Sequence, residues 1–368
     1  MITKNAFVWS GLLALSVVVG VGASTQSTSI FRTSDQDTLK YPKEKYLRNL
    51  RMLTFGGDNA ESYFSFNGKS IVFQRTDKSA GIPCDQIYTW NLADGPMTQM
   101  NPKRVSTGTG RTTCSYFLGG DSLLLYASTH ESGLECPPEP SKELGYLWPV
   151  YDSFEIYVSD LNGNIRRKLT DRKGYDAEAT VSPKGDLIVF TSDRSGDLEL
   201  WTMRPDGSEL RQITSGLGYD GGAFFSPDGT QLVFRASRPK TPEAVEKYKS
   251  LLAKGLVAPS DMEIYTCNID GSNLRQITNL GRANWAPFFH PSGKKIVFSS
   301  NHASERIYQF NLWMINTDGT GLEQITFDPV FDAFPMFSPD GTKLMFSSNR
   351  FNGGTRATNI FVADWVEP

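Results

Sequence analysis

Six polar residues recur at one point of a repeated sequence pattern, and their chemistry suggests a binding site. Each stands six residues before a tight-turn signal, and none is basic: Asn59, Thr112, Asp176, Asp220, Asn284 and Asp332. A ring of carboxylates and amides favours a cationic group, such as a lysine or arginine of a bound chain or a metal ion. Because Asp and Asn at strand starts also cap turns through nearby backbone amides, a structural role stays open.

Aromatic and charged residues adjoin these polar positions in the sequence. The aromatic neighbours are Tyr175, Tyr219, Trp285 and Phe331, and the charged ones are Arg111 and Glu178. With the six polar residues they form a predicted ligand-binding channel mouth, where binding should be salt-sensitive. We expect neither a catalytic residue nor a metal ligand in this set.

The elements that position these residues repeat along the chain. YDGGAFFSPDGTQLVFRAS begins at Tyr219, and YDAEATVSPKGDLIVFTSDR, from Tyr175, has the same order. In the unit from Tyr219, four strands are predicted over 223–225, 231–235, 263–268 and 274–278, because Pro, Asp and Gly turn the chain between them. The first turn of the unit recurs six times, at Ser65, Leu118, Ser182, Ser226, His290 and Ser338. We therefore predict an all-β fold, a six-bladed β-propeller with four-stranded antiparallel blades.

The last repeat lacks its fourth strand. After the strand pattern that ends at Trp365 only three residues remain, whereas NLRMLT at 49–54 matches NLRQIT at 273–278. We expect the N-terminal segment to supply the outer strand of the last blade, which would cover an otherwise unpaired edge. Residues 46–368 are then a single propeller domain.

The first 45 residues precede the repeats. Lys4, the apolar run 6–21 and the small residues Val21-Gly22-Ala23 predict that 1–23 is a signal peptide, with a membrane anchor as the alternative. The polar stretch 24–45 is interpreted as a flexible linker or loosely docked arm. The mature protein should therefore be periplasmic or secreted, without a membrane span.

Composition narrows the class of partner. The 368 residues carry a formal net charge of −3, and no run of Lys or Arg stands out. The electrostatic signature of a nucleic-acid-binding protein is therefore missing. We expect a monomer.

Long insertions mark one face of the predicted disk. They interrupt blades 2, 4 and 5 at 128–152, 238–261 and 301–310, all between the second and third strands. Loops of this length are usually functional, although tolerated drift is the alternative. Thr241, Pro242 and Glu243 begin a predicted helix in the blade 4 insertion, and its apolar stripe should pack on the rim beside the channel mouth.

Four cysteines allow a disulfide in an exported protein. Cys84, Cys114 and Cys136 fall in one predicted neighbourhood, whereas Cys267 is expected to be a small buried residue. We predict one disulfide among the first three, with Cys114 as the preferred participant. A thiol–metal site is a minor alternative.

The repeated motifs resemble a known family. SPDG turns, LVF or IVF strands, an S-x-R motif and D-G-[ST]-x-L-x-x-[LI]-T are similar to TolB-like β-propeller repeats over residues 46–368. The resemblance implies an exported protein with partners in the bacterial envelope. The short segment 24–45 leaves no space for the N-terminal α/β domain of TolB, so we expect a propeller alone.

The resemblance leaves two classes of function. We expect a non-enzymatic propeller of WD-like repeats that binds a protein, peptide or other envelope ligand at the insertion face and channel mouth. The alternative is a propeller-type hydrolase or metal-dependent lyase acting on a carbohydrate or peptide in the channel. No G-x-S-x-G elbow occurs, and His130, His290 and His302 are not expected to cluster. We expect no cofactor, with a channel-bound cation as the alternative.

Overall fold

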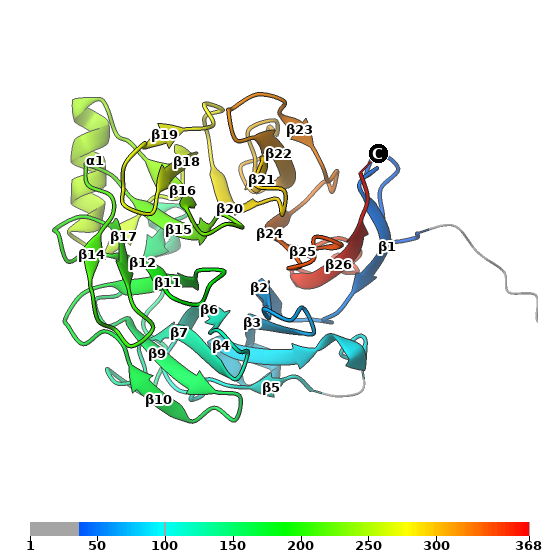
Figure 1. The fold of residues 1–368 in the computed structure, drawn as a ribbon, viewed down its shortest axis with the longest axis horizontal. Coiled ribbons are helices and arrows are strands. Elements are labelled where there is room, and N and C mark those ends of the chain that lie inside the picture. The colour runs from blue at the N-terminus through cyan, green and yellow to red at the C-terminus, as the bar shows by residue number, and fades with distance from the viewer. Residues whose placement is uncertain (1–36, 99–100, 368) are drawn as a thin grey trace, which may run out of the picture. The chain divides into compact units, whose positions relative to one another are not determined.

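Six sheets surround a common axis (Figure 1). A computed structural model describes residues 37–98 and 101–367, so the predicted signal peptide 1–23 and residues 24–36 lie outside the described residues. Each sheet has four antiparallel strands, which confirms the six-bladed propeller. No helix within the described ranges is long and apolar enough to cross a membrane.

In the first three blades the strands follow chain order from the axis outward. The short strand β8, which comes between β7 and β9 in the chain, belongs to no blade. Blade 1 contains β2 (Asp58–Phe64), β3 (Ser70–Asp77), β4 (Ile82–Asn91) and β5 (Lys103–Arg104). Blade 2 contains β6 (Thr112–Phe117), β7 (Leu123–Ser128), β9 (Glu155–Asp160) and β10 (Ile165–Lys168). Blade 3 contains β11 (Asp176–Val181), β12 (Ile188–Ser192), β13 (Glu199–Met203) and β14 (Arg211–Gln212).

The remaining blades follow the same plan, and the last one takes its outer strand from the start of the chain. Blade 4 contains β15 (Asp220–Phe225), β16 (Gln231–Ser237), β18 (Met262–Asn268) and β19 (Arg275–Gln276). Blade 5 contains β20 (Asn284–Phe289), β21 (Lys295–Ser300), β22 (Asn311–Asn316) and β23 (Glu323–Gln324). Blade 6 contains β24 (Asp332–Phe337), β25 (Lys343–Ser348), β26 (Asn359–Trp365) and β1 (Leu47–Met52).

The pairing of β1 with β26 closes the ring. Leu47 lies opposite Trp365, and Met52 lies opposite Phe361. The predicted closure by an N-terminal strand is confirmed, and it removes the free edge of β26. Residues just before β1 also pack on the propeller: the fully buried Glu44 carboxylate accepts two hydrogen bonds from Arg350, each 3.0 Å long. The end of the segment interpreted as a linker or arm is thus docked.

Local turn chemistry explains why the strands reverse where they do. In blade 4, the Ser226 hydroxyl accepts hydrogen bonds from the amides of Thr230 and Gln231, and the Gly229 amide donates to the Ser226 carbonyl over 2.8 Å. Gly229 has φ of +73°, which a residue with a side chain rarely adopts. The repeated SPDG signal therefore fixes the join between the first two strands of a blade.

Each innermost strand carries a β-bulge four residues before its turn. The pairing register slips by one residue at this point in all six blades. The bulge residues all have positive φ, between +44° and +60°: Glu61, Cys114, Glu178, Gly222, Ala286 and Phe334. A bulge re-aims side chains, so residues on either side of it no longer follow a strict alternation.

The two longest insertions meet over one end of the channel. The insertion of blade 2 contains the 3-10 helix η3 (Lys142–Leu144) and β8 (Trp148–Pro149), and β8 pairs with β17 (Leu256–Val257) of the blade 4 insertion. Two further 3-10 helices, η1 (Lys78–Ala80) and η2 (Leu92–Asp94), lie in blade 1. We call the face onto which the long insertions open the insertion face.

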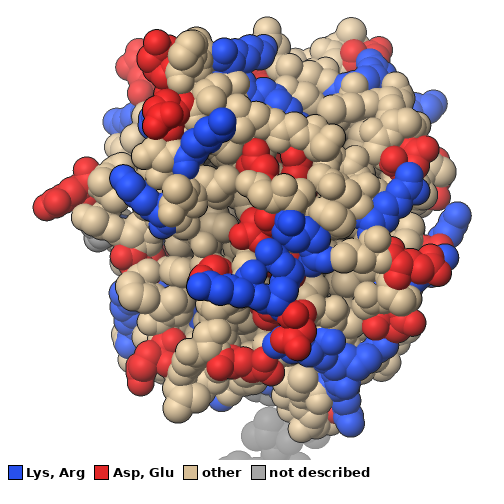
Figure 2. Space-filling model, turned by 90° about the vertical axis from the view of Figure 1, so that its left-hand side faces the viewer, with Lys and Arg blue, Asp and Glu red and all other residues tan. Residues whose placement is uncertain are grey.

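The predicted helix is confirmed as α1 (Pro242–Leu252). The Thr241 hydroxyl caps it by accepting a hydrogen bond from the Ala244 amide. The predicted apolar stripe is half-buried, and the Tyr248 hydroxyl donates to Asp197 on blade 3. On the side of the molecule where α1 lies, basic and acidic side chains are interspersed (Figure 2).

Candidate functional site

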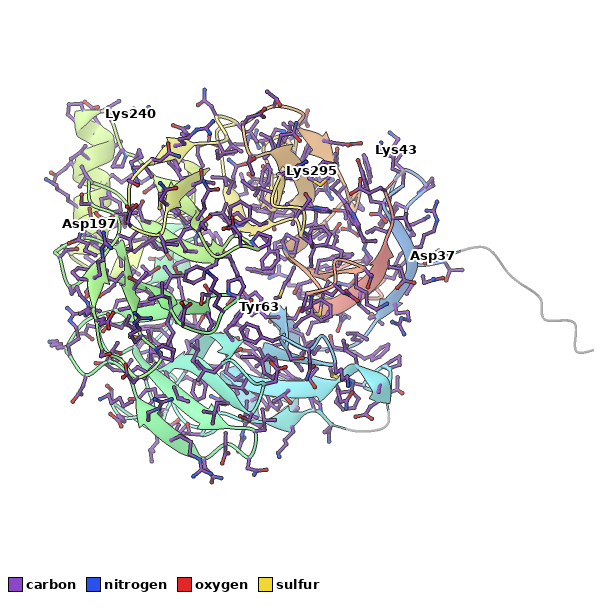
Figure 3. All side chains as sticks on the ribbon, in the orientation of Figure 1. Asp37, Lys43, Tyr63, Asp197, Lys240 and Lys295 are labelled. Carbon is purple, nitrogen blue, oxygen red and sulfur yellow. A yellow bond between two sulfur atoms is a disulfide. The ribbon has the colours of Figure 1, made fainter. Side chains whose placement is uncertain are left out.

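A cavity of about 390 Å³ occupies the end of the channel at the insertion face. This volume is within the range of small-molecule and side-chain binding sites. Its floor includes Tyr63, Thr180 and Phe224. These residues stand two positions before a turn, in a layer that also contains Tyr116, Phe288 and Met336. Tyr63 lies near the centre of the ring of blades (Figure 3). Its ring centroid is 5.4 Å from that of Phe224 on the opposite blade. The two rings therefore meet across the channel axis and close the channel below the cavity.

The wall above this floor is the set of bulge residues. All six line the cavity, and each blade therefore contributes one side chain, or a glycine, at the same level. Because the set contains two glutamates, a cysteine, a glycine, an alanine and a phenylalanine, the wall is chemically uneven. We call these residues the bulge ring.

Glu178 is the most strongly held member of the bulge ring. Its carboxylate accepts hydrogen bonds from Arg235 over 2.6 Å, from the Thr191 hydroxyl over 2.8 Å and from the Gly222 amide over 2.8 Å, and also from the Tyr219 hydroxyl. Burial alone would raise the pKa of Glu178, but Arg235 and these donors lower it below its usual value. The carboxylate is therefore ionised and fixed in place.

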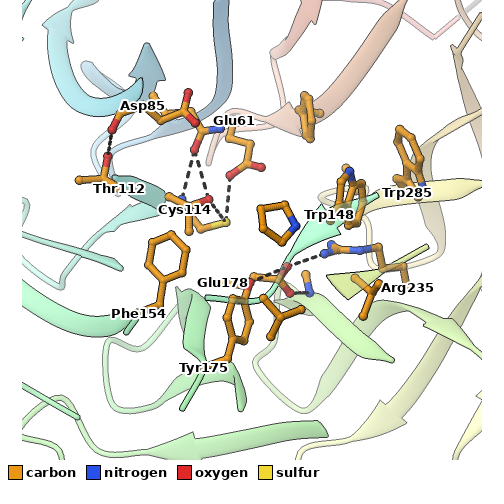
Figure 4. Close-up of a pocket in the computed structure, with 18 of the residues that line it drawn as sticks. Glu61, Asp85, Thr112, Cys114, Trp148, Phe154, Tyr175, Glu178, Arg235 and Trp285 are labelled. Atoms are coloured by element: carbon orange, nitrogen blue, oxygen red, sulfur yellow. Dashed lines mark hydrogen bonds and ion pairs between the residues drawn. The ribbon is translucent and has the colours of Figure 1, made fainter. Parts of the chain in front are cut away.

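Glu61 faces the same cavity, but it forms no ion pair with any basic side chain of residues 37–98 and 101–367. Its Oε2 accepts a hydrogen bond from the Cys114 thiol over 3.0 Å, and Figure 4 shows its carboxylate directed into the space shared with Glu178. Burial, with a contribution from the charge of Glu178, raises the pKa of Glu61 to about 7. Burial and the neighbouring carboxylates also raise the pKa of the Cys114 thiol well above its ordinary value, so this cysteine is a poor nucleophile.

The blade 2 insertion forms an aromatic roof. Trp148 lies 5.0 Å from the Arg235 guanidinium and 5.1 Å from the ring of Trp285, and its indole N–H donates to the Tyr146 hydroxyl. A disulfide between Cys84 in β4 and Cys136 in the insertion ties this roof to blade 1. The structure thus confirms one disulfide among the three candidates. The preference for Cys114 was wrong, because the bulge turns its side chain to Glu61.

Charged groups also stand at the edge of the roof. Arg111 donates to Asp85 over 3.0 Å and to Glu139 of the insertion. Burial raises the pKa of Asp85 although Arg111 and Thr76 oppose the shift. Arg111 therefore links blade 2 to blade 1 and to the roof.

Seven of the twelve residues predicted for the channel mouth line this cavity. They are Arg111, Thr112, Tyr175, Glu178, Tyr219, Trp285 and Phe331. The other five lie outside its lining and are buried: Asn59, Asp176, Asp220, Asn284 and Asp332. The structure thus brings the predicted aromatic residues together but sets most of the predicted polar ring apart from them.

Each of the three aspartates outside the lining forms an ion pair with an arginine that follows the second strand of its own blade. Arg194 contacts both oxygens of Asp176 at 2.9 and 3.0 Å, and Arg238 contacts both oxygens of Asp220. Arg350 contacts Asp332 at 2.8 Å. These carboxylates are therefore engaged within the blades, by arginine side chains and not by the backbone amides of the capping alternative.

The asparagines hold neighbouring blades together. The Asn59 amide donates to the Thr358 carbonyl of blade 6 over 3.0 Å, and the Asn284 amide donates to the Met262 carbonyl of blade 4 over 2.8 Å. Thr112, which does line the cavity, donates to the Asp85 carbonyl of blade 1. The strand-start position thus joins neighbouring blades where it is Asn or Thr, and it pairs with an arginine of its own blade where it is Asp.

Sequence reasoning missed Glu61, Asp85 and Arg235. The bulge position could have been noticed, because it varies from Glu to Gly to Phe within strands that otherwise repeat closely. Arg235 occupies a strand interior where the other repeats have Gln74, Ala127, Thr191, Ser299 and Ser347, an isolated charge that also signals a partner. The helix expected beside the channel mouth, α1, contributes no residue to the cavity lining, whereas Val257 of β17, which follows α1 in the chain, does line it.

The histidines lie in separate places. His130 contacts Tyr157 with ring centroids 4.5 Å apart, and His302 contacts Trp313 at 4.2 Å, with the rings tilted in both pairs. His290 hydrogen-bonds to Ser292 within its turn. Within residues 37–98 and 101–367, no group of three or more His, Cys, Asp and Glu side chains is placed to hold a metal ion.

Comparison with known proteins finds similarity over part of the chain. Residues 142–245 match the TolB beta propeller domain family. An uncharacterised protein of Agrobacterium fabrum is 36% identical over 55 residues, which are 15% of this chain and only 19% of that protein.

Solved structures share the fold at low identity. A protein assigned as TolB from Agrobacterium tumefaciens superposes with a TM-score of 0.57 at 20% identity, covering 85% of this chain and 91% of that one. TolB from Acinetobacter baumannii gives 0.50 at 17% identity, covering 84% of this chain and 64% of that one. An oligogalacturonate lyase from Vibrio parahaemolyticus gives 0.50 at 12% identity, covering 86% and 96%.

Proposed function

We propose that this chain, a TolB-like six-bladed β-propeller, is an exported binding protein without catalytic activity, and that its ligand enters the cavity of the insertion face. The ligand is a segment of a protein or peptide, or another ligand of the cell envelope. The observation that carries this proposal is that the two longest insertions pair with each other, through β8 and β17, and cover the cavity. Below the cavity, Tyr63 and Phe224 meet across the channel axis. Long loops supported on a rigid scaffold are typical of binding sites.

The chemistry of the cavity supports binding over catalysis. Glu178 accepts hydrogen bonds from five donors, and the Cys114 thiol is protonated, so neither group is free to attack a substrate. The aromatic side chains of Tyr146, Trp148 and Trp285 supply the apolar surface from which most binding free energy comes.

Two observations support export. The segment 1–23 has the composition of a signal peptide, and the Cys84–Cys136 disulfide suits an oxidising compartment. Protein purified from its native cells should therefore begin after Ala23. Alkylation without reduction should label only Cys114 and Cys267, and labelling of all four cysteines would contradict the proposal.

Site-specific cross-linking tests the binding face. A photoreactive amino acid replaces Tyr146 on the roof, or Leu274 at the outer edge of blade 4, in the full chain produced by its native cells. The Tyr146 variant should give a discrete adduct that the Leu274 variant lacks. Adducts only from Leu274, or equal adducts from both, would show that the insertion face is not the binding face.

One observation favours an enzyme as the second candidate. Glu61 and Glu178 share the cavity, and their environments move their pKa values in opposite directions. Such a division is typical of an acid–base pair, and the lyase of Vibrio parahaemolyticus shows that the fold can carry catalysis. The purified protein should be tested on oligogalacturonate and other oligosaccharides with added divalent cations. Product formation that Glu61→Gln abolishes would favour the enzyme.

A further inference from the structure

Exposed apolar side chains concentrate on the insertion face. Among the described residues, twelve large apolar side chains are exposed, and eight of them lie in loops of this face: Phe55, Leu134, Leu144, Tyr146, Ile307, Tyr308, Val330 and Phe351. The other four, Ile165, Leu210, Leu274 and Leu322, occupy one repeated position after the outer hairpin of a blade. Apolar exposure gathered on one face is typical of a protein-docking surface.

The cavity beneath these loops has an excess of negative charge. Four carboxylates line it, Glu61, Asp85, Glu139 and Glu178, against the two guanidiniums of Arg111 and Arg235. Arg111 pairs with Asp85 and Glu139, and Arg235 pairs with Glu178. Among the described residues Glu61 has no such partner, and its one hydrogen bond to a side chain comes from the Cys114 thiol.

The wall beside Glu61 suits the stem of a long basic side chain. Lysine and arginine place their methylene groups along apolar surfaces and direct only the charged end to a polar group. Trp148, Trp285 and Phe334 line the same cavity, so the stem would contact aromatic rings. Aromatic faces also attract cations directly. The cavity is thus complementary to a cation on an apolar stem.

We propose that the ligand of the insertion face is a protein segment that inserts a lysine or arginine side chain onto Glu61. The apolar residues that flank it contact the exposed apolar side chains of the insertion loops. This inference rests on the proposed function and names the chemistry of its ligand. The Cys114 thiol donates to Glu61 and so helps to position its carboxylate, whereas Arg235 is already paired with Glu178.

Peptide pools of defined composition test the proposal. Each pool contains acetylated and amidated nine-residue peptides with one fixed central residue, Lys, Arg, Gln or Glu, and mixed flanks that are either apolar or polar. Binding to the full chain is measured by fluorescence anisotropy of labelled peptides. Pools with central Lys or Arg and apolar flanks should bind at least about tenfold more tightly than those with central Gln, since a charge-assisted contact is lost.

A matched pair of variants assigns the preference to one carboxylate. Glu61→Gln should abolish the preference for Lys or Arg over Gln. Glu305→Gln, an exposed residue in the blade 5 insertion outside the cavity lining, should preserve it. Melting temperatures of both variants show whether the fold is intact.

The outcomes separate this inference from the proposed function. If apolar-flanked pools bind regardless of their central residue, the insertion face is a binding site but the basic side chain is wrong. The inference is also overturned if the preference survives in Glu61→Gln. If no pool binds, while free cadaverine or arginine binds in a Glu61-dependent way, the ligand is a small amine and the protein segment is wrong.

Discussion

Two sets of residues, only two positions apart on the same six strands, have opposite environments. The strand-start residues are buried. Asp176 and Asp332 pair with arginines of their own blades, whereas Asn284 donates to a backbone carbonyl of the preceding blade. The bulge ring, which includes Glu61 and Glu178, faces the cavity. The first set fastens strands within a blade or to the preceding blade, and the second lines the cavity where a ligand would bind.

The bulge between the two sets explains this difference. An uninterrupted strand would direct residues two apart to the same side, so both sets would face the channel. The one-residue register slip turns the strand-start side chains away from the channel axis. Polarity at a strand start is therefore weak evidence for a channel ligand in this fold. The predictions below test this division between fastening and binding, from the largest expected effect to the smallest.

Removal of Arg350 should have the largest effect on stability. Arg350 lies fully buried between Glu44 and Asp332, so Arg350→Ala leaves two buried carboxylates without a counter-charge. The free energy of unfolding should fall by about 3–5 kcal/mol, as measured by urea denaturation. A triple variant with Arg350→Met, Glu44→Gln and Asp332→Asn should recover much of this loss, because no buried charge remains. A fall below about 1 kcal/mol would contradict the fastening role.

Gly222→Ala should damage the binding layer itself. Gly222 has φ of +60°, and an added Cβ would collide with the Arg235 guanidinium. Displacement of Arg235 would leave Glu178 buried without its cation, so a loss of about 2–3 kcal/mol is expected. Fluorescence of Trp148, which stacks on Arg235, should change as well. Unchanged stability and unchanged fluorescence would show that Arg235 is not fixed by its contact with Glu178.

These contacts show which parts of the molecule the sequence could predict. The blades, their turns, the closure by β1 and the cap of α1 depend on local signals such as Ser226-Pro227-Asp228-Gly229 and Thr241-Pro242, and they were predicted correctly. The aromatic part of the cavity was also predicted, because those residues adjoin the strand starts.

The remainder of the site depends on contacts between blades. The Glu178–Arg235 pair joins blades 3 and 4, and the Glu61–Cys114 contact joins blades 1 and 2. Nothing within one repeat indicates which side chains will meet across the channel. The choice of Cys136 over Cys114 as the partner of Cys84 has the same cause, since the path of a long insertion decides it.

Glu61→Gln should change how stability depends on pH. The pKa of Glu61 rises from 4.5 to about 7 on folding, so the folded protein keeps a proton that the unfolded chain releases across this interval. Stability contributed by this group is therefore present below about pH 4.5 and is lost as the pH rises to about 7. The variant should be more stable than the wild type at pH 8 by on the order of 1–3 kcal/mol.

Denaturant titrations of both proteins between pH 4 and 8 measure this difference. It should grow with pH and then level off above about pH 7. Asp176→Asn serves as the contrasting variant, because its carboxylate is paired with Arg194 and its removal should lower stability at pH 8. A constant difference between wild type and Glu61→Gln at every pH would mean that Glu61 is ionised throughout and has a cationic partner.

The smallest expected effect comes from the bulge of blade 5, where Ala286 has φ of +47°. An L-residue in the left-handed region carries a conformational cost of roughly 1 kcal/mol, which glycine avoids. Glycine also loses more backbone entropy on folding, so Ala286→Gly should stabilise the protein by only about 0.5 kcal/mol. It should leave peptide binding unchanged, because Ala286 contributes one methyl group and no charge to the wall. Calorimetry gives the melting temperatures of Ala286→Gly and Gly222→Ala, and so compares two opposite substitutions within the bulge ring. A destabilised Ala286→Gly would mean that the methyl contact outweighs the backbone strain, and that the bulge ring is shaped by packing as well as by the ligand.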